Sequence, residues 1–262
     1  MGLLLPHKST ITVYSDMVTV SEKKEHKASG GGKRGDIENF SADARYRLFR
    51  LLHSIEFERV TFITLTYPAE FPTNPKIYKG HLREFRRRFE RKFGAVRAVW
   101  RLEFQERGAP HFHIMYLDCQ FIPIGTLSLM WHKVIKSKDE NHLKNGVDLK
   151  LIVGNSEKRL IASYIGKYIS KVDKGVQSDN ENKVGRYYGR WNITEETPYT
   201  FEIPSGQTFA FVRYALMCSG GSTLWEPGDT NQCTVFGSSM GDRKFGVKMV
   251  EYEGMLRSSN RK

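Results

Sequence analysis

Apolar residues recur along the chain at two characteristic spacings, which predict alternating helices and strands between residues 41 and 172. Spacings of three and four residues predict helices over 42–55, 79–93, 125–136 and 156–172. β-Branched runs and alternating apolar residues predict strands over 60–67, 96–105, 111–118 and 147–153. Because a hairpin of strands is interleaved with helices, the pattern indicates an α+β fold with a central antiparallel sheet and helices packed on it.

The two ends of the chain carry a weaker pattern. A β-prone run over 10–20 is followed by a basic, glycine-containing segment over 22–35, which is typical of a flexible linker. The segment beyond residue 195 is rich in Gly and Ser and predicts only a few short strands. We therefore expect a basic, partly flexible N-terminal extension (1–40), a central domain (41–195) and a C-terminal extension of unknown role (196–262).

Three polar side chains are predicted to meet on one face of the hairpin over 96–118. Strand side chains alternate, so His111 and His113 share a face. By the same alternation Glu103 lies on the polar face of the preceding strand. If the two strands pair about a turn centred on Gly108, Glu103 lies directly opposite His113. Two imidazoles and one carboxylate leave positions open for water and substrate, as a catalytic metal requires, but they do not separate zinc from manganese or magnesium. A polar patch on a half-buried sheet is the simpler alternative.

Two tyrosines four residues apart, Tyr164 and Tyr168, share one stripe of the predicted helix 156–172 with Lys167 and Lys171. A phenol with a pKa of ~10 is a poor nucleophile at neutral pH. A metal on the scissile phosphate and nearby ammonium groups would favour phenolate attack and offset the developing charge. Two tyrosines allow two successive transesterifications, so the pattern predicts cutting and rejoining of single-stranded DNA. Packing tyrosines with solvated hydroxyls are the structural alternative.

The charge of the chain is consistent with a nucleic-acid partner. Lysine and arginine number 41 against 29 acidic residues, which gives a net charge of +12 and favours a polyanionic partner. Within the predicted helix 79–93, basic residues lie on the face opposite the apolar stripe, where contact with a phosphate backbone and plain solvation are equally compatible with the pattern. The candidate DNA-binding residues on this face are Arg83, Arg86, Arg87, Arg88 and Arg91.

Several classes of protein are disfavoured by the sequence. No run approaches the ~18 apolar residues of a membrane span, and the first residues are too short for a secretory signal, so we expect a cytoplasmic protein without a membrane partner. The three cysteines lack a Cys-x-x-Cys spacing and are expected to be reduced thiols. The three glycines at 30–32 are not followed by a phosphate-loop pattern, so no nucleotide cofactor is expected.

Four segments of the chain carry ordered signatures. They are the strand Phe62–Tyr67, Glu103 with Gly108–His113, the tyrosine and lysine segment Tyr164–Lys171, and Gly185–Trp191. In this order and spacing they resemble the motifs of the HUH endonuclease superfamily, in particular the two-tyrosine rolling-circle replication initiators of small phages and plasmids.

The resemblance implies both a fold and an activity. The fold is a five-stranded antiparallel sheet with flanking helices, a ferredoxin-like (RRM-like) sandwich. The activity is a metal-dependent (Mg²⁺ or Mn²⁺) nick in single-stranded origin DNA, at a hairpin or specific site, through a covalent 5′-phosphotyrosine intermediate and a free 3′-hydroxyl primer, with strands rejoined at termination. Unwinding and synthesis would fall to a host helicase and polymerase.

Other functions stay open at this point. A relaxase or transposase of a mobile element uses the same chemistry. A non-catalytic nucleic-acid-binding regulator on the same sheet would explain the charge, and its binding would survive EDTA and loss of the tyrosines. A metal-dependent hydrolase that activates water would keep the histidines but would not need Tyr164 or Tyr168.

Overall fold

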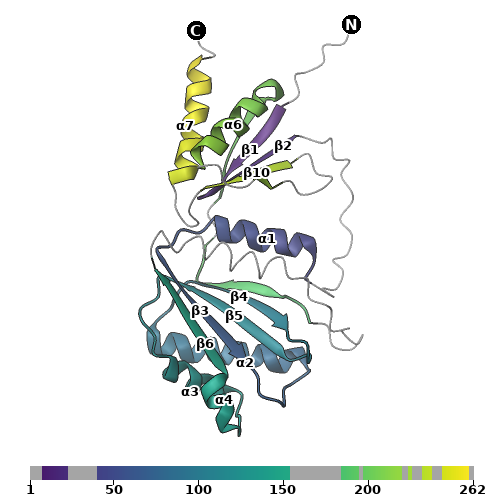
Figure 1. Ribbon diagram of the computed structural model, residues 1–262, viewed down its shortest axis with the longest axis vertical. Coiled ribbons are helices and arrows are strands. Elements are labelled where there is room, and N and C mark those ends of the chain that lie inside the picture. Colours follow the sequence, from purple (N-terminus) through teal and green to yellow (C-terminus); the bar gives the residue numbers. More distant parts are fainter. Residues whose placement is uncertain are drawn as a thin grey trace.

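The computed structural model describes residues 8–22, 40–153, 184–194, 197–219, 224–225, 232–237 and 244–259. In these ranges two five-stranded antiparallel sheets lie one above the other, with helix α1 (Ala42–His53) between them (Figure 1). The predicted α+β class, an antiparallel sheet with flanking helices, is therefore confirmed. The predicted linker over 22–35 lies outside the described residues from residue 23 onward. None of the helices in these ranges is both long and apolar enough to span a bilayer.

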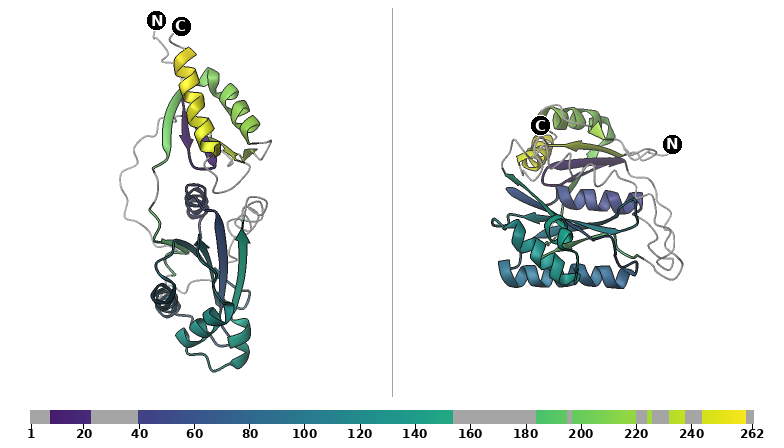
Figure 2. Two further views of the ribbon diagram at one scale, coloured as in Figure 1. Left: turned by 90° about the vertical axis from the view of Figure 1, so that its left-hand side faces the viewer. Right: turned by 60° about the horizontal axis from the view of Figure 1, so that its bottom comes forward.

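The lower sheet carries the predicted central strands and, with its helices, forms what we call the lower unit. Its strand order is β6-β3-β5-β4-β7. The strands are β6 (Val147–Val153), β3 (Arg59–Thr66), β5 (Pro110–Leu117), β4 (Ala98–Phe104) and β7 (Tyr188–Trp191). Three helices cover the face turned away from α1 (Figure 2). They are α2 (Pro75–Phe93), α3 (Ile124–Val134) and α4 (Glu140–Asn145).

Helix α2 is attached to the lower sheet by its aromatic stripe. Phe85 and Phe89 are fully buried, and the ring of Phe89 stacks on that of Tyr116 at 4.2 Å. The helix begins at Pro75, four residues earlier than predicted, because proline suits the first helical turn and the Asn74 side chain accepts a hydrogen bond from the backbone of Lys76. The stripe therefore fixes which face of the sheet is apolar core.

The upper sheet joins both ends of the described chain, in the order β8-β1-β2-β10-β9. Its strands are β8 (Tyr199–Pro204), β1 (Lys8–Val13), β2 (Met17–Glu22), β10 (Gln232–Phe236) and β9 (Leu224–Trp225). In β1, Ile11 pairs with Val20 of β2 on one side and with Phe201 of β8 on the other. We call this sheet, with its helices, the upper unit. The two segments that the sequence analysis treats as separate extensions thus share one sheet.

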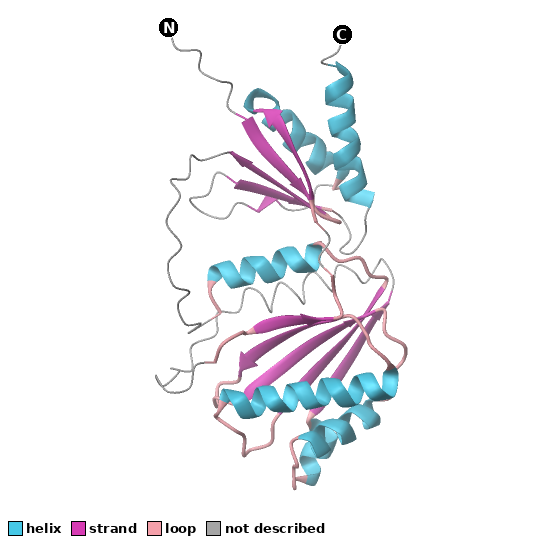
Figure 3. Ribbon diagram, turned by 180° about the vertical axis from the view of Figure 1, so that it is seen from behind, coloured by secondary structure: helices cyan, strands magenta, loops and turns pink. Residues whose placement is uncertain are grey.

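Two helices of the upper unit were missed by the prediction of short strands alone. They are α6 (Thr208–Cys218), which follows the short 3-10 turn η1 (Ser205–Gln207), and α7 (Lys244–Ser259). Both pack on one face of the upper sheet, seen from behind in Figure 3. Glycine lowers the helical propensity of α7, but Gly246 is needed there, because a Cβ at this position would lie 2.4 Å from the carbonyl oxygen of Tyr14.

Helix α1 contacts both units. Leu48, Leu51 and Leu52 belong to the core of the lower unit. On the other side the His53 ring lies 5.1 Å from the ring of Phe236, and its Nδ1 is 2.8 Å from a carboxylate oxygen of Asp16 in the turn between β1 and β2. Both His53 and Asp16 are buried, so this contact anchors the upper unit to α1.

Candidate metal centre and nucleic-acid face

The β4–β5 hairpin places the predicted polar residues on one face. Trp100 pairs with Ile114 on the face that α2 covers, so Glu103, His111 and His113 lie on the opposite face, as predicted. This is the side of the sheet on which α1 lies.

The predicted register of the hairpin is wrong by two residues. Glu103 pairs with His111, and Arg101 takes the predicted place of Glu103 opposite His113. The hairpin closes through a three-residue turn, in which the backbone N–H of Gln105 donates to Ala109 and that of Gly108 donates to Gln105, with Gly108 at φ +81°. Because side chains alternate with a period of two, a two-residue shift preserves the shared face.

Both ring nitrogens of His113 contact a polar side chain. Its Nε2 lies 3.1 Å from Oε2 of Glu103, and its Nδ1 lies 3.3 Å from Oγ1 of Thr64, which is its cross-strand neighbour on β3. A carboxylate has no proton to give, so Nε2 donates to Glu103. The ring of His111 lies 4.6 Å from that of His113. The side chains of His113 and Glu103 are only 14% and 9% exposed, so the pair is largely enclosed.

Two arginines of this hairpin were not singled out for a role by the sequence analysis. Arg101 is buried on the same face, with its guanidinium 4.8 Å from the ring of Phe40. Arg107, in the hairpin turn, donates to the backbone oxygens of Tyr67, Pro68 and Ala69 and so ties the hairpin to the loop after β3. Arg101 has the strand parity of Glu103, which was the signal available in the sequence. Nothing local marked Arg107.

The residue types on this face suit a divalent ion, although no metal geometry is formed. Within the ranges described above, no group of three or more His, Cys, Asp or Glu side chains is arranged to hold an ion. Nε2 of His113 and Oε2 of Glu103 contact each other instead, and these are the atoms that would bind a metal. A metal held by these two atoms would take the place of this hydrogen bond, and the imidazole proton would then lie on Nδ1 of His113 and not on Nε2. The Thr64 hydroxyl can then accept from Nδ1, because a hydroxyl both donates and accepts.

The arginine face of α2 is partly neutralised by its own glutamates, since two carboxylates bind three of the five candidate arginines. Arg87 and Arg88 bind Glu84 at 2.8 and 2.6 Å, and these hydrogen bonds lower the pKa of Glu84 to about 2. Arg86 binds Glu90 at 2.9 Å. Of the five candidate residues, Arg83 and Arg91 are exposed, and neither forms an ion pair with a described residue.

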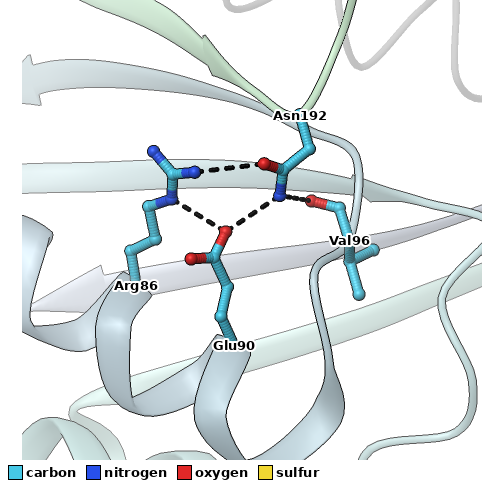
Figure 4. Close-up of polar contacts among 4 residues, drawn as sticks. All are labelled: Arg86, Glu90, Val96 and Asn192. Carbon is cyan, nitrogen blue, oxygen red and sulfur yellow. Dashed lines mark hydrogen bonds and ion pairs between the residues drawn. The ribbon is translucent and has the colours of Figure 1, made fainter.

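Arg86 has a structural role that sequence reasoning missed. Its guanidinium donates to the Asn192 side chain at 3.2 Å, and Asn192 in turn donates to Glu90 and to the backbone oxygen of Val96 (Figure 4). The same guanidinium lies 5.3 Å from the ring of Trp191. Arg86 therefore fixes the end of β7 to α2. The signal was not local, because Asn192 lies 106 residues away in the sequence.

The predicted nucleophile segment is not placed by the structure. Tyr164, Lys167, Tyr168 and Lys171 all lie outside the described residues. Their assignment, like that of the metal ligands, stays a prediction from the sequence. In the chain this segment follows β6, whose Asp148 pairs with Thr64, the neighbour of His113.

The central part of the chain is similar to a known family of proteins. No match was found among curated proteins or among solved structures. A family model described as Replication-associated protein ORF2/G2P matches residues 60–173. The match begins at β3, includes the β4–β5 hairpin with both histidines, and extends past the predicted tyrosines. Residues 60–173 are thus similar to the Replication-associated protein ORF2/G2P family, a family of rolling-circle replication initiators.

Proposed function

We propose that the protein initiates rolling-circle replication by nicking single-stranded origin DNA through a tyrosine. The observation that supports this most directly is the contact between His113 and Glu103, beside His111, on an enclosed sheet face within the matched segment. This combination of residues suits a metal-assisted reaction on a phosphodiester.

In this proposal Glu103, His111 and His113 hold one Mg²⁺ or Mn²⁺ ion, which polarises the scissile phosphate when bound. Thr64 keeps the His113 ring oriented, with Nε2 towards Glu103. The low exposure of the pair excludes water and strengthens each electrostatic contact.

Tyr164 or Tyr168 supplies the nucleophile. Its phenolic oxygen gives up its proton and forms a bond to phosphorus, the bond from phosphorus to the 3′-oxygen breaks, and that oxygen takes up a proton to become the primer hydroxyl, so that no net proton is lost. The 5′-phosphate stays on the tyrosine, so phosphoester bonds are exchanged and none is hydrolysed. The second tyrosine carries the return transfer that rejoins strands, and Lys167 and Lys171 hold the phosphate.

This activity needs a surface that contacts the DNA backbone and partner proteins that unwind and copy the DNA. Arg83 and Arg91 are the α2 arginines best able to contact the DNA backbone, since the other three bind Glu84 or Glu90. We further propose that a host helicase unwinds the duplex and a host polymerase extends the primer, in the cytoplasm.

The test is a search for the covalent adduct. The protein is incubated with Mn²⁺ and labelled circular single-stranded DNA from its own replicon, and is then run on a denaturing gel beside Tyr164→Phe, Tyr168→Phe and the double variant. We expect a labelled, protease-sensitive band that the double variant lacks, and the single variants assign the two roles. Cleavage without an adduct would indicate water as the nucleophile. Binding without cleavage of a confirmed origin strand would indicate a regulator.

A further inference from the structure

The chain that leads into β7 is fixed to α2 by a single lysine. Lys79 donates from its Nζ to the backbone oxygens of Val184 and Arg186, the second at 2.9 Å. Gly185 lies between these two residues with φ +69°, and a Cβ there would lie 3.4 Å from the Lys79 Nζ. Glycine therefore leaves room beside the ammonium group. The two hydrogen bonds place the charge of Lys79 at the backbone of Arg186.

The side chain of Arg186 lies on the candidate metal face. The ring of Tyr187 is buried and lies 6.4 Å from the ring of Phe104, on the face that α2 covers. Neighbouring side chains of an extended chain alternate, so Arg186 lies on the opposite face. The register of β4 with β7, continued by two residues, brings Arg186 opposite Glu103. Arg186 thus lies about 10 Å across the sheet from His111, at the edge of the candidate metal face.

Lys79 and Arg186 are two cations held close together. Burial of the ammonium group and, as the smaller cause, the charge of Arg186 lower the pKa of Lys79 to about 8. Arg186 is exposed, and neither side chain forms an ion pair with a carboxylate of the described residues. The two carbonyl oxygens explain the position of Lys79 but not the guanidinium beside it. An anion bound between the two groups would relieve their repulsion.

We propose that Lys79 and Arg186 bind a backbone phosphate of the single-stranded DNA, next to the scissile phosphate. This inference rests on the proposed function and adds to it a DNA contact that the sequence analysis did not assign. The distance of Arg186 from His111 suits a neighbouring phosphate better than the phosphate at the metal. A guanidinium can bind two phosphate oxygens at once, and the ammonium group adds a point charge.

The competing role is a structural tie that only fixes β7 to α2. In such a tie the charge of Arg186 has no consequence for DNA binding. A phosphate site has a different signature, because removal of Arg186 relieves the repulsion on Lys79 while it weakens the complex with DNA. Stability and affinity therefore separate the two roles.

The experiment compares Arg186→Ala and Arg186→Lys with the wild-type protein, with Arg213→Ala on the exposed side of α6 as a matched control. Measured are the Tm and the affinity for a labelled oligothymidylate in EDTA, by fluorescence anisotropy at several salt concentrations. We expect Arg186→Ala to weaken binding by about 3- to 10-fold and to lower the slope of log affinity against log salt by about 0.7, as loss of one phosphate contact does.

The Tm of Arg186→Ala should be unchanged or higher, and Arg186→Lys should keep most of the affinity. The proposal is overturned if Arg186→Ala binds DNA with the affinity and salt slope of Arg213→Ala. It is also overturned if the Tm of Arg186→Ala falls while the salt slope stays that of the wild-type protein, because this result indicates a structural tie.

A second measurement follows Lys79 directly, through the pH titration of the carbon-13 shift of its ε-carbon. We expect its pKa to rise in Arg186→Ala, because a like charge is lost. In the wild-type protein it should rise when oligothymidylate binds, because an anion favours the protonated form. A pKa of Lys79 that DNA leaves unchanged would overturn the proposal. An equal rise with inorganic phosphate at the same ionic strength would do so too, because it indicates a general anion site.

Both measurements are independent of nicking, because binding in EDTA requires neither the metal nor the tyrosines. If the wild-type protein makes no adduct, the proposed function fails, and loss of affinity in Arg186→Ala would still support a phosphate site. If the adduct forms and Arg186→Ala binds DNA like the wild-type protein, only this inference fails.

Discussion

The two units share an architecture and differ in chemistry. Each has a five-stranded antiparallel sheet with helices packed on one face. On the opposite face the lower sheet carries Arg101, Glu103 and His113, whereas the upper sheet carries Thr12 and Thr19 in neighbouring strands. In the described residues, basic side chains outnumber acidic ones in the lower unit and equal them in the upper unit. A shared architecture therefore says little about chemistry, which depends on the residues of the face that turns towards α1.

The largest expected effect is the loss of adduct formation when His113 of the lower sheet is replaced. His113→Ala should lower adduct formation by about 1000-fold or more, because it removes both the contact to Glu103 and a predicted metal ligand. Salt-sensitive binding to single-stranded DNA in EDTA should change little. Thr12→Ala in the upper sheet is the control and should react normally. A folded His113→Ala protein that no longer binds DNA would contradict the metal assignment.

The second prediction concerns the packing of helix α7 on the β1–β2 turn, within the upper unit. Gly246→Ala should lower the free energy of unfolding by about 1–3 kcal/mol, because its Cβ meets the backbone oxygen of Tyr14 at 2.4 Å. Gly254→Ala, in the same helix with open space around it, should raise stability by up to about 1 kcal/mol. Urea denaturation of both variants gives the comparison. Equal effects at the two positions would show that α7 does not pack on the β1–β2 turn.

A smaller effect is expected when the Thr64 hydroxyl, which orients His113, is removed. Thr64→Val should raise the Mn²⁺ concentration for half-maximal adduct formation by about 10-fold, because the ring loses its second hydrogen bond. Thr64→Ser keeps the hydroxyl and should behave like the wild-type protein. Thr19→Val, a buried threonine of the upper sheet, is the matched control. If Thr64→Val and Thr64→Ser shift the midpoint equally, the lost methyl packing and not the hydrogen bond is responsible.

The smallest expected effect concerns the charge of α2. The double variant Arg83→Ala with Arg91→Ala should weaken binding to single-stranded DNA and lower the slope of log affinity against log salt by about 1. Arg87→Ala with Arg88→Ala should change the slope less, because Glu84 already binds both side chains. Anisotropy titrations at several salt concentrations measure both. A larger change from the second pair would mean that DNA displaces Glu84.

Local patterns predicted the lower unit well and the upper unit poorly, for a physical reason. The face shared by Glu103, His111 and His113 follows from side-chain alternation, which needs no knowledge of the rest of the fold. The register did not follow, because it depends on the conformation of the turn at Gly108. Contacts between distant residues have no local signal at all.

The upper sheet and the role of Arg86 depend on such distant contacts. Ile11 pairs with Phe201, and Arg86 with Asn192, across long stretches of sequence. The helical propensity of α7 is lowered by Gly246, which is retained for its close contact with Tyr14. The roles of Tyr164 and Tyr168 stay predictions from the sequence.

The pairing of β1 and β2 with strands from the far end of the chain affects the order of events during synthesis. The ribosome releases β1 and β2 before the other described strands, and an isolated two-stranded hairpin is only marginally stable in water. Their partners β8 and β10 emerge only after all described strands of the lower sheet have been made. The lower unit can therefore fold during translation, before the β1–β2 hairpin has its partner strands. The upper sheet therefore forms after the described strands of the lower sheet.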